Sequence, residues 1–326
     1  MHTIPRRSIA LALGLLMGVA NLANAQATFP DKPIRIILGF APGAITDTVA
    51  RAVGAQMSKN IGQPVVVENR AGAGGTLASE AVARAPADGY TLLLGEAGGM
   101  SINPLLMPNL SYNPERDFVP IAQVVNLPLV LVAHPGANIK KVGDLATYGA
   151  ANKGLNYGTA GPGTIQHLSV ELFKVASKLP FNHIPYRGGA PALNDLVGGQ
   201  IPLLSVTVAT VSPQVKAGQA IPVVLLGKSR SAAMPTVPTL VEAGFQNIEM
   251  GNPWQGFFAP ANTPPAIINR LNAEIRKAVE APEVRDRLTS AGAEVVVGSS
   301  EDFRVMLRAE KAAWTQAIQA GGVKPQ

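Results

Sequence analysis

Short apolar, β-branched runs alternate with helical patterns from Pro33 onward. The run 34–38 is typical of a buried strand, and Val49, Val53 and Met57 then recur every four residues on one helical face. The same pattern predicts further elements downstream: strands at 64–68 and 90–94 and a helix at 76–85. Because strands that alternate with helices pair in parallel beneath them, this part of the chain predicts an α/β sheet.

A second alternation follows a long extended run from Val119 to Val132. Its expected strands, at 155–157, 181–185 and 201–205, are separated by helical patterns. One of these patterns is carried by Leu168, Leu172, Val175 and Ala176. A further extended run at 221–226 carries the chain back toward the first module. Two such crossings are what a two-lobed protein with a hinged cleft requires.

The C-terminal part is helical by the same criteria. Helices that brace the lobes are expected at 265–279 and 301–320, with a strand at 293–297 between them. The stretch 251–265, rich in proline and glycine, is the nearest thing to a linker. The fold class expected is α/β, with two lobes that are each a mostly parallel sheet flanked by helices, joined by two hinge-crossing strands. The boundaries that follow are 26–126 with 228–326 for the first lobe and 127–227 for the second.

The first 25 residues are expected to be an export signal rather than part of the fold. Arg6 and Arg7 form a positive n-region, 9–19 is an apolar h-region, and Ala23-Asn24-Ala25 is a pattern that signal peptidase accepts. A membrane anchor is the alternative, but the apolar run is shorter than the roughly 20 residues of a spanning helix. The mature protein, cleaved after Ala25 or nearby, is therefore expected outside the cytoplasm.

The composition of the chain excludes several kinds of site and partner. The chain has 326 residues, 47% hydrophobic and 15% charged, which supplies a sizeable core and disfavours disorder. It has no cysteine, which excludes disulfides, thiolate metal sites and cysteine nucleophiles. Removal of Arg6 and Arg7 with the signal lowers the net charge from +6 to +4. A surplus that small, without a basic run, argues against nucleic acid as a partner.

The motifs of common enzyme classes are missing or incomplete. Gly72-Ala73-Gly74-Gly75 follows a strand and precedes a helix, but the third glycine of a dinucleotide fingerprint would fall at Leu77. Gly227-Lys228-Ser229 resembles the end of a phosphate-binding loop but follows a strand run that lacks the upstream glycine. No histidine pair has metal-ligand spacing, and no Gly-x-Ser-x-Gly elbow occurs. No metal or cofactor is expected, and catalysis is disfavoured without being excluded.

Three loops rich in glycine, threonine and proline stand at expected strand ends, just before helices: 40–47, 72–76 and 158–164. In the first, Thr46 or Asp47 caps the helix and leaves backbone N–H groups unpaired, a geometry that binds anions. The alternatives are that Asp47 is a helix cap alone and that the glycines form simple turns. Because α/β proteins bind ligands at the carboxyl ends of parallel strands, three such loops favour a binding site.

Segments spread over essentially the whole mature chain resemble the Bug-type extracytoplasmic solute-binding proteins of tripartite tricarboxylate transporters. They are FPDKPIR at 29–35, APG at 41–43 with TDTVAR at 46–51, VENRAGAGG at 67–75, ADGYTLL at 87–93, RDF at 116–118, YRGGAPA at 186–192 with DLVGG at 195–199, and PTVPTL at 235–240 with EAGF at 242–245. Each segment is weak alone, but their order along the chain is specific.

The resemblance implies a periplasmic-binding-protein fold of the flytrap, type II-like kind, which closes on a small organic solute. Such proteins commonly hold carboxylates through backbone N–H groups, hydroxyls and water at helix starts. The three loops here contain no basic residue, which agrees. Matched by position, the implied ligand-binding residues are Pro42, Gly43, Ala44, Thr46 and Asp47 in the first loop, Gly74, Gly75 and Thr76 in the second, Gly163, Thr164 and His167 in the second lobe, and Tyr186, Arg187 and Gly188 at a strand end.

Two features depart from the family's pattern. Relatives usually carry more glycines after Pro42, whereas Ala44 and Ile45 here narrow the pocket or make it more apolar. Glu96 stands after the third strand, at a ligand-binding position expected to be neutral in relatives. If it faces the cleft, it repels anions and favours a ligand with an amine or another donor; the alternative is that it points to water. Carboxylates, aromatic ones included, therefore rank first, and amide-bearing or zwitterionic solutes second.

Several residues have a structural alternative. His167 either contacts ligand or only stabilises its loop, and its neutral form is favoured at a helix N-terminus. Arg187 is expected to face solvent rather than pair with a carboxylate, and Asp195 to pack or cap within its helix. Trp254 is expected to be a packing or hinge aromatic, and Trp314 to lie in the core.

Three functional classes remain open. A solute receptor that delivers its ligand to a membrane permease of the tripartite tricarboxylate transporter type ranks first. A sensor with the same binding site that feeds a two-component kinase is the alternative. A secreted enzyme acting on a small organic acid is the third. By analogy with the family, the protein is expected to be a monomer.

Overall fold

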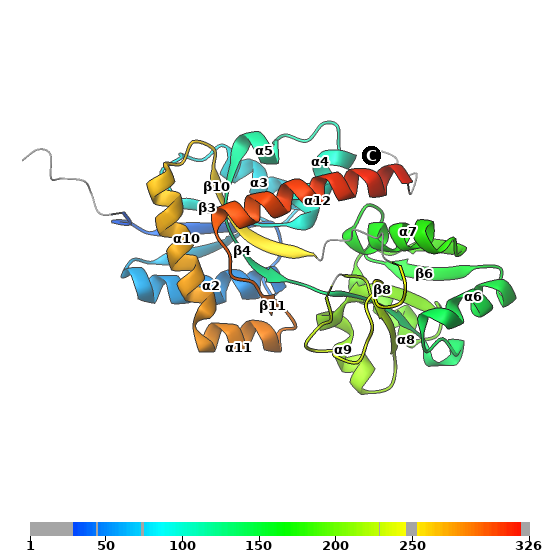
Figure 1. Ribbon diagram of the computed structural model, residues 1–326. Helices are drawn as coiled ribbons and strands as arrows, with labels where there is room; N and C mark the ends of the chain where they lie inside the picture. Colours follow the sequence, from blue (N-terminus) through cyan, green and yellow to red (C-terminus); the bar gives the residue numbers. More distant parts are fainter. Residues whose placement is uncertain (1–28, 44, 73–74, 228, 246–252, 321–326) are drawn as a thin grey trace, which may run out of the picture.

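The computed structural model describes residues 29–320, except 44, 73–74, 228 and 246–252. The expected signal peptide, Ala44 and Gly74 therefore lie outside the described residues. The chain forms two lobes side by side, each built on one β-sheet with helices against it (Figure 1). Within the described part, no helix is both long and apolar enough to cross a membrane.

The first lobe contains a six-stranded sheet with the order β11-β4-β10-β3-β1-β2. Its strands are β1 (Ile34–Leu38), β2 (Val65–Asn69), β3 (Thr91–Glu96), β4 (Phe118–Asn126), β10 (Trp254–Pro260) and β11 (Glu294–Val295). β1 pairs in parallel with β2 and β3, whereas β10 is antiparallel to β3 and β4, and β11 is antiparallel to β4. Four of the six strands thus share one direction.

Helices cover both faces of this sheet. They are α2 (Ile45–Ile61), α3 (Thr76–Ala83), η2 (Gly98–Ile102), α4 (Asn103–Leu106), α5 (Pro114–Asp117), α10 (Pro265–Glu280), α11 (Pro282–Ser290) and α12 (Ser300–Ala320). Alternate strand residues point to opposite faces. Ile36 and Leu92 pack into the core under α2, α10 and α11. Ile37 and Leu93 pack into the other core, which α3 and α12 cover.

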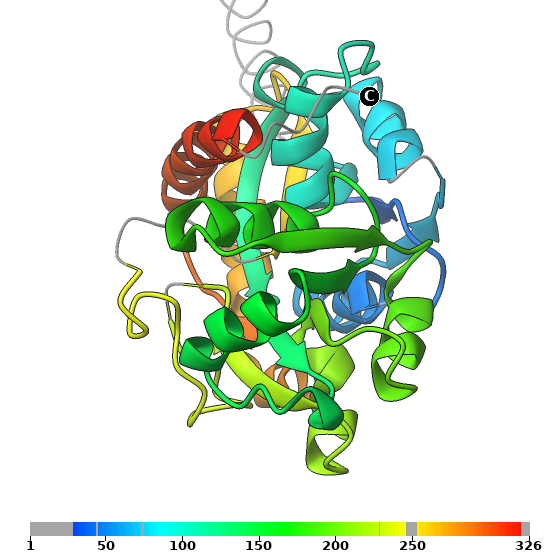
Figure 2. The same cartoon turned by 90° about the vertical axis from the view of Figure 1, so that its right-hand side faces the viewer.

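The second lobe contains a five-stranded sheet with the order β7-β6-β8-β5-β9. Its strands are β5 (Leu129–Ala133), β6 (Leu155–Thr159), β7 (Phe181–Pro185), β8 (Leu203–Thr207) and β9 (Ile221–Leu225). β5 runs against the other four. The helices of this lobe are η3 (Pro135–Ala137), α6 (Val142–Ala151), α7 (Ile165–Ser177), α8 (Gly189–Val197) and α9 (Val208–Lys216). Figure 2 shows this lobe, in green, in front of the first.

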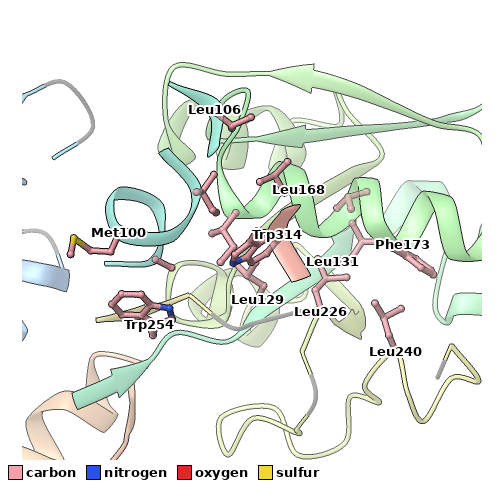
Figure 3. Packing of buried hydrophobic residues seen from close by; sticks show 14 of the residues in the cluster. Met100, Leu106, Leu129, Leu131, Leu168, Phe173, Leu226, Leu240, Trp254 and Trp314 are labelled. Carbon is pink, nitrogen blue, oxygen red and sulfur yellow. The ribbon is translucent and has the colours of Figure 1, made fainter. Parts of the chain in front are cut away.

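The last helix joins the two lobes. Phe303, near its start, packs against the Trp254 ring of the first lobe at 5.2 Å between centroids. Trp314, near its end, is fully buried beside residues of the second lobe (Figure 3), namely Leu129, Leu131 and Leu168. The bracing role expected of this helix and the core position expected of Trp314 are both confirmed.

The expectation of a linker at 251–265 is wrong, because the structure places β10 there, between β3 and β4 in the middle of the first sheet. All seven residues of β10 are buried. Gly256 and Pro260 hide the strand from pattern analysis, since both are unusual inside strands. Gly256 has a packing reason: a Cβ there would lie 2.4 Å from Cζ of Phe303.

The extended run 119–132 divides between the two sheets. β4 ends at Asn126, and β5 begins at Leu129 in the other sheet. The break falls at Leu127 and Pro128, and Pro128 accepts a hydrogen bond from the N–H of Val208, 2.8 Å away. The run is therefore one of the two expected crossings between the lobes. The expectation that 221–226 is the other crossing is wrong, because β9 belongs to the second sheet and Thr239, farther along the chain, still forms a β-bridge with Leu225.

Candidate functional site

The carboxyl ends of the parallel strands in both sheets face the boundary between the lobes. β4 runs toward the boundary, since its end at Asn126 nearly adjoins the start of β5, and β1, β2 and β3 run the same way. β5 runs away from the boundary and pairs antiparallel with β8, with Leu129 opposite Thr207. β8 and its parallel neighbour β6, which in turn pairs with β7, therefore end at the boundary. The three candidate loops thus meet where α/β proteins bind ligands.

The first loop is held closed by Asp47, which is buried in the first turn of α2. Its carboxylate accepts hydrogen bonds from the N–H of Gly43 at 3.1 Å, from Nε of Arg51 at 3.0 Å and from Nδ2 of Asn69 at 2.9 Å. The Arg51 hydrogen bond is the largest of the effects that lower the pKa of Asp47 to about 2. Both carboxylate oxygens are thus engaged within the protein, so Asp47 shapes the loop. Pro42 and Gly43 are exposed.

The first and second loops touch each other through two glycines. A Cβ on Gly39, just after β1, would lie 2.3 Å from Cα of Gly75. Gly75 itself has a φ of 90° at the start of α3, a conformation that glycine adopts without strain. Thr76, the first residue of α3, is partly buried. The structure therefore brings the end of β1 against the start of α3.

A polar cluster at the end of β3 and the start of β10 adjoins α2. Nε2 of Gln255 donates to Oγ1 of Thr46 at 2.7 Å, while Oε1 of Gln255 is buried without a hydrogen-bond partner. Glu96 lies opposite Gln255 in the antiparallel register, so the two side chains share one face. Glu96 is only partly exposed. Its partial burial raises the pKa of its carboxyl group to about 7, and a hydrogen bond from the Gly99 backbone opposes this shift.

The loop of the second lobe is ordered around the start of α7. Thr164 caps the helix and donates its hydroxyl to the carbonyl of Gly161 at 2.7 Å. The N–H of Gly163 donates to Nδ1 of His167 at 3.1 Å, so this ring nitrogen is an acceptor already used by the loop. Burial lowers the pKa of His167, which keeps the ring neutral. His167 therefore stabilises its own loop.

Behind this loop lies a chain of polar side chains. The ring of His167 stacks on His183 with centroids 3.9 Å apart, and Nε2 of His183 lies 2.7 Å from Oγ1 of Thr159. Burial lowers the pKa of His183 to about 4. The hydroxyl of Tyr157 donates to Oε1 of Glu171 at 2.7 Å. Despite these side chains, the described residues include no group of three or more such ligands that could hold a metal ion.

Residues 186–188 lie at the end of β7, on the same edge of the sheet. The hydroxyl of Tyr186 donates to Oδ2 of Asp195 at 2.7 Å, so this tyrosine is tied to α8. Arg187 is exposed, and Gly188 has a φ of 123° at the start of α8. This segment therefore borders the boundary, with the Tyr186 hydroxyl engaged elsewhere.

Two residues at the boundary were missed from the sequence. Gln255 was hidden in the stretch interpreted as a linker. Thr207 ends β8 and caps α9, accepting a hydrogen bond from the N–H of Thr210 at 3.4 Å. A threonine before a helical run was the available signal for Thr207. The lobes approach each other where the second-lobe loop faces α4, since a Cβ on Gly163 would lie 3.0 Å from Cδ1 of Leu106.

Comparisons with known proteins agree with this arrangement. BugT from Bordetella pertussis is 33% identical over 316 residues, which cover 96% of this chain and 97% of BugT. The solved structure of Rpa4515 from R. palustris with adipate is 31% identical, with a TM-score of 0.80 over 91% of this chain and 100% of that one. MatC (Rpa3494) from Rhodopseudomonas palustris with bound malate is 34% identical, with a TM-score of 0.74 over 89% and 100%. The family model for TctC, the tripartite tricarboxylate transporter family receptor, matches residues 49–323, and the chain belongs to this family.

Proposed function

We propose that this protein captures a small organic carboxylate between its lobes and delivers it to the permease of a tripartite tricarboxylate transporter. Membership of the receptor family supports the role, and two solved relatives hold the dicarboxylates adipate and malate. The observation that carries the proposal is the convergence of strand ends and helix starts at one boundary. The N-termini of α2 and α7 follow β1 and β6 there, and helix N-termini attract anions.

The contacts we propose come from loops of both lobes. They are Pro42, Gly43, Ala44 and Thr46 from the first loop, Gly74, Gly75 and Thr76 from the second, Glu96 from β3, Gly163 and Thr164 from the second lobe, and Arg187 and Gly188 at the end of β7. Asp47, His167 and Tyr186 instead position these loops, because their polar atoms bond within the protein. The hydroxyl of Thr164 is engaged in the same way, so we assign its contact to the backbone N–H. Gln255 positions Thr46, because its Nε2 donates to the Thr46 hydroxyl.

We propose further that closure moves the two lobes against each other. The second lobe runs beyond the expected boundary at 227, because Met234 and Val237 pack in its core and Thr239 forms a β-bridge with Leu225. The crossing at Leu127 and Pro128 is one pivot, because the chain leaves the first sheet at Asn126 and enters the second at Leu129. The protein acts as a monomer in the periplasm after its signal peptide is removed, as the N-terminal pattern and the transporter family suggest.

The test is native mass spectrometry of the exported protein, followed by thermal shift with the released solute and with an organic-acid panel. A stoichiometric carboxylate that raises the melting temperature when added back is the expected result. A protein with no adduct, no stabilisation and measurable turnover of an acid would favour the enzyme. The sensor would be favoured by two results together. The purified protein binds the solute, and a strain lacking the gene still transports the solute but has lost the kinase response.

A matched pair of variants locates the solute. Gly163→Asp places a negative charge at the start of α7, and Gly218→Asp places the same charge at the far end of α9. The backbone strain is equal, because the two glycines have φ angles of 70° and 71°. A Cβ at Gly163 would also lie 3.0 Å from Leu106, so Gly163→Asn is the uncharged control for that contact. We expect the first variant to weaken carboxylate binding at least tenfold and the second to leave it unchanged. Equal affinities would remove the second-lobe loop from the site.

A further inference from the structure

A cavity of about 680 Å³ opens on the first lobe, between α12 on one side and η2, α4 and α5 on the other. Apolar side chains form its inner wall, among them Met100, Phe118, Phe258 and Leu307. Basic side chains stand around it: Arg116, Arg304, Arg308 and Lys311. The lining is therefore mixed, apolar and polar, and its volume falls within the roughly 300–1,000 Å³ that is typical of small-molecule sites.

This cavity is separate from the boundary between the lobes. β4 contributes Phe118 and Pro120, at its first residues, whereas it reaches the boundary at Asn126. The nine residues of β4 place its two ends roughly 26 Å apart. Leu105 of α4 lines the cavity, while Leu106 approaches the second-lobe loop at Gly163 instead. A ligand in the cavity would therefore leave the cleft free.

Three basic side chains of α12 lie together at the cavity, an arrangement that favours an anion. Arg304, Arg308 and Lys311 are spaced four and three residues apart, which puts them on one face of the helix around Leu307. Arg304 pairs with Glu301, and Lys311 with Glu115 at 2.7 Å. Arg308 has no ion pair or hydrogen bond within the described part of the chain. Like charges four residues apart disfavour a helix, so a bound counter-charge would stabilise this face.

We propose that this cavity binds an amphipathic organic anion, a carboxylate with an aliphatic or aromatic body, independently of the solute in the cleft. The Arg308 guanidinium takes the carboxylate, with Lys311 beside it, because arginine binds carboxylates through paired hydrogen bonds. The apolar body lies against Phe118, Phe258 and Leu307 and is removed from water there.

The cavity is linked to an internal reporter. Ser101 lines it and donates its hydroxyl to Oε2 of Glu310 at 2.8 Å. The same oxygen accepts the indole N–H of Trp254 at 2.6 Å. A ligand against Ser101 therefore alters the surroundings of Trp254, one of two tryptophans in the chain, and tryptophan emission follows binding.

The test is calorimetric titration of the mature protein with octanoate, accompanied by tryptophan emission, with octan-1-ol as the uncharged counterpart. We expect one octanoate per chain and at least tenfold weaker binding of octan-1-ol. The double variant Arg308→Ala with Lys311→Ala should weaken octanoate binding at least tenfold. The matched control, Lys277→Ala with Arg285→Ala, removes the same charge from exposed positions of α10 and α11 and should stay within twofold.

Adipate at saturating concentration distinguishes the cavity from the cleft. Octanoate binding that persists in adipate and falls only in the cavity variant supports the proposal, whatever becomes of the receptor function. Absence of octanoate binding overturns it. So does binding of equal strength in the two double variants, or loss of binding when adipate is added, because either would place octanoate elsewhere.

Discussion

Trp254 donates its indole N–H to the carboxylate of Glu310, 2.6 Å away and 56 residues along the chain. Both groups are buried, and Ser101 donates to the same carboxylate oxygen. The contact ties β10, η2 and α12 together in the first lobe. Since α12 continues to Trp314 in the core of the second lobe, this hydrogen bond also fixes the helix that joins the lobes. Burial raises the pKa of Glu310.

Replacing Glu310 with alanine should destabilise the protein more than an exposed substitution on the same helix. The change leaves the Trp254 N–H and the Ser101 hydroxyl buried without their acceptor, which costs about 1–3 kcal/mol. Urea unfolding followed by circular dichroism measures the loss. Glu301→Ala, exposed in the first turn of α12, is the control and should change stability by less than about 1 kcal/mol. Equal losses would mean that the buried carboxylate contributes nothing specific.

Glu96→Gln should change how stability depends on pH. The pKa of Glu96 is raised from 4.5 to about 7, so the folded state keeps a proton that the unfolded state releases between those values. Stability therefore falls as pH rises from 4.5 to 7, and glutamine removes this fall. Melting temperatures from pH 4 to pH 8 should converge at the acid end and favour the variant at the alkaline end. Glu280→Gln, at an exposed position of α10, should keep the parent profile.

The same variant should alter solute affinity. A carboxylate at the end of β3 repels an anionic solute once it is ionised, whereas glutamine does not. At pH 8 we therefore expect Glu96→Gln to bind a dicarboxylate such as adipate more tightly than the parent, and at pH 5 about equally. Titration calorimetry at the two pH values measures this. Weaker binding by the variant at pH 8 would instead show that Glu96 accepts a donor group of the solute.

Asp47→Ala should open the first loop and weaken solute binding. The substitution removes the acceptor of Gly43, Arg51 and Asn69 and costs about 1–3 kcal/mol of stability. The pKa of Asp47 is lowered from 3.8 to about 2, so its contribution is present above pH 3.8 and is lost as pH falls toward 2. Chemical unfolding at pH 7 and pH 2 checks both statements. Asp286→Ala, on the exposed face of α11, should show neither effect.

Gly39→Ala should disturb the contact between the first two loops. Its Cβ would lie 2.3 Å from the backbone of Gly75, so one loop must move, at a cost of about 1–3 kcal/mol. Gly143→Ala, at an exposed position in the first turn of α6, has no such contact and should leave stability unchanged or raise it by up to about 1 kcal/mol. Matching stabilities of the two variants in urea would show that the loops separate freely.

Local patterns predicted most elements of this fold. The strands at 34–38 and 181–185 have the expected bounds, and the helix of Val49, Val53 and Met57 is α2. Such runs are decided by side-chain periodicity and by what a strand or helix must bury, which are properties of neighbouring residues. The glycine and threonine loops were likewise found at strand ends, because their residues suit turns and helix caps.

The tertiary structure alone decided which of these residues are available to a ligand. Asp47 and His167 carry the chemistry of a binding site, but contacts with Asn69 and with the Gly163 backbone engage them. Gln255 was hidden because β10 is a central strand that contains glycine and proline. The glycine, Gly256, packs against Phe303, which lies 47 residues later in the chain. Periodicity reports only what each segment buries, whereas the partners of a polar group come from distant segments, so only the folded chain reveals them.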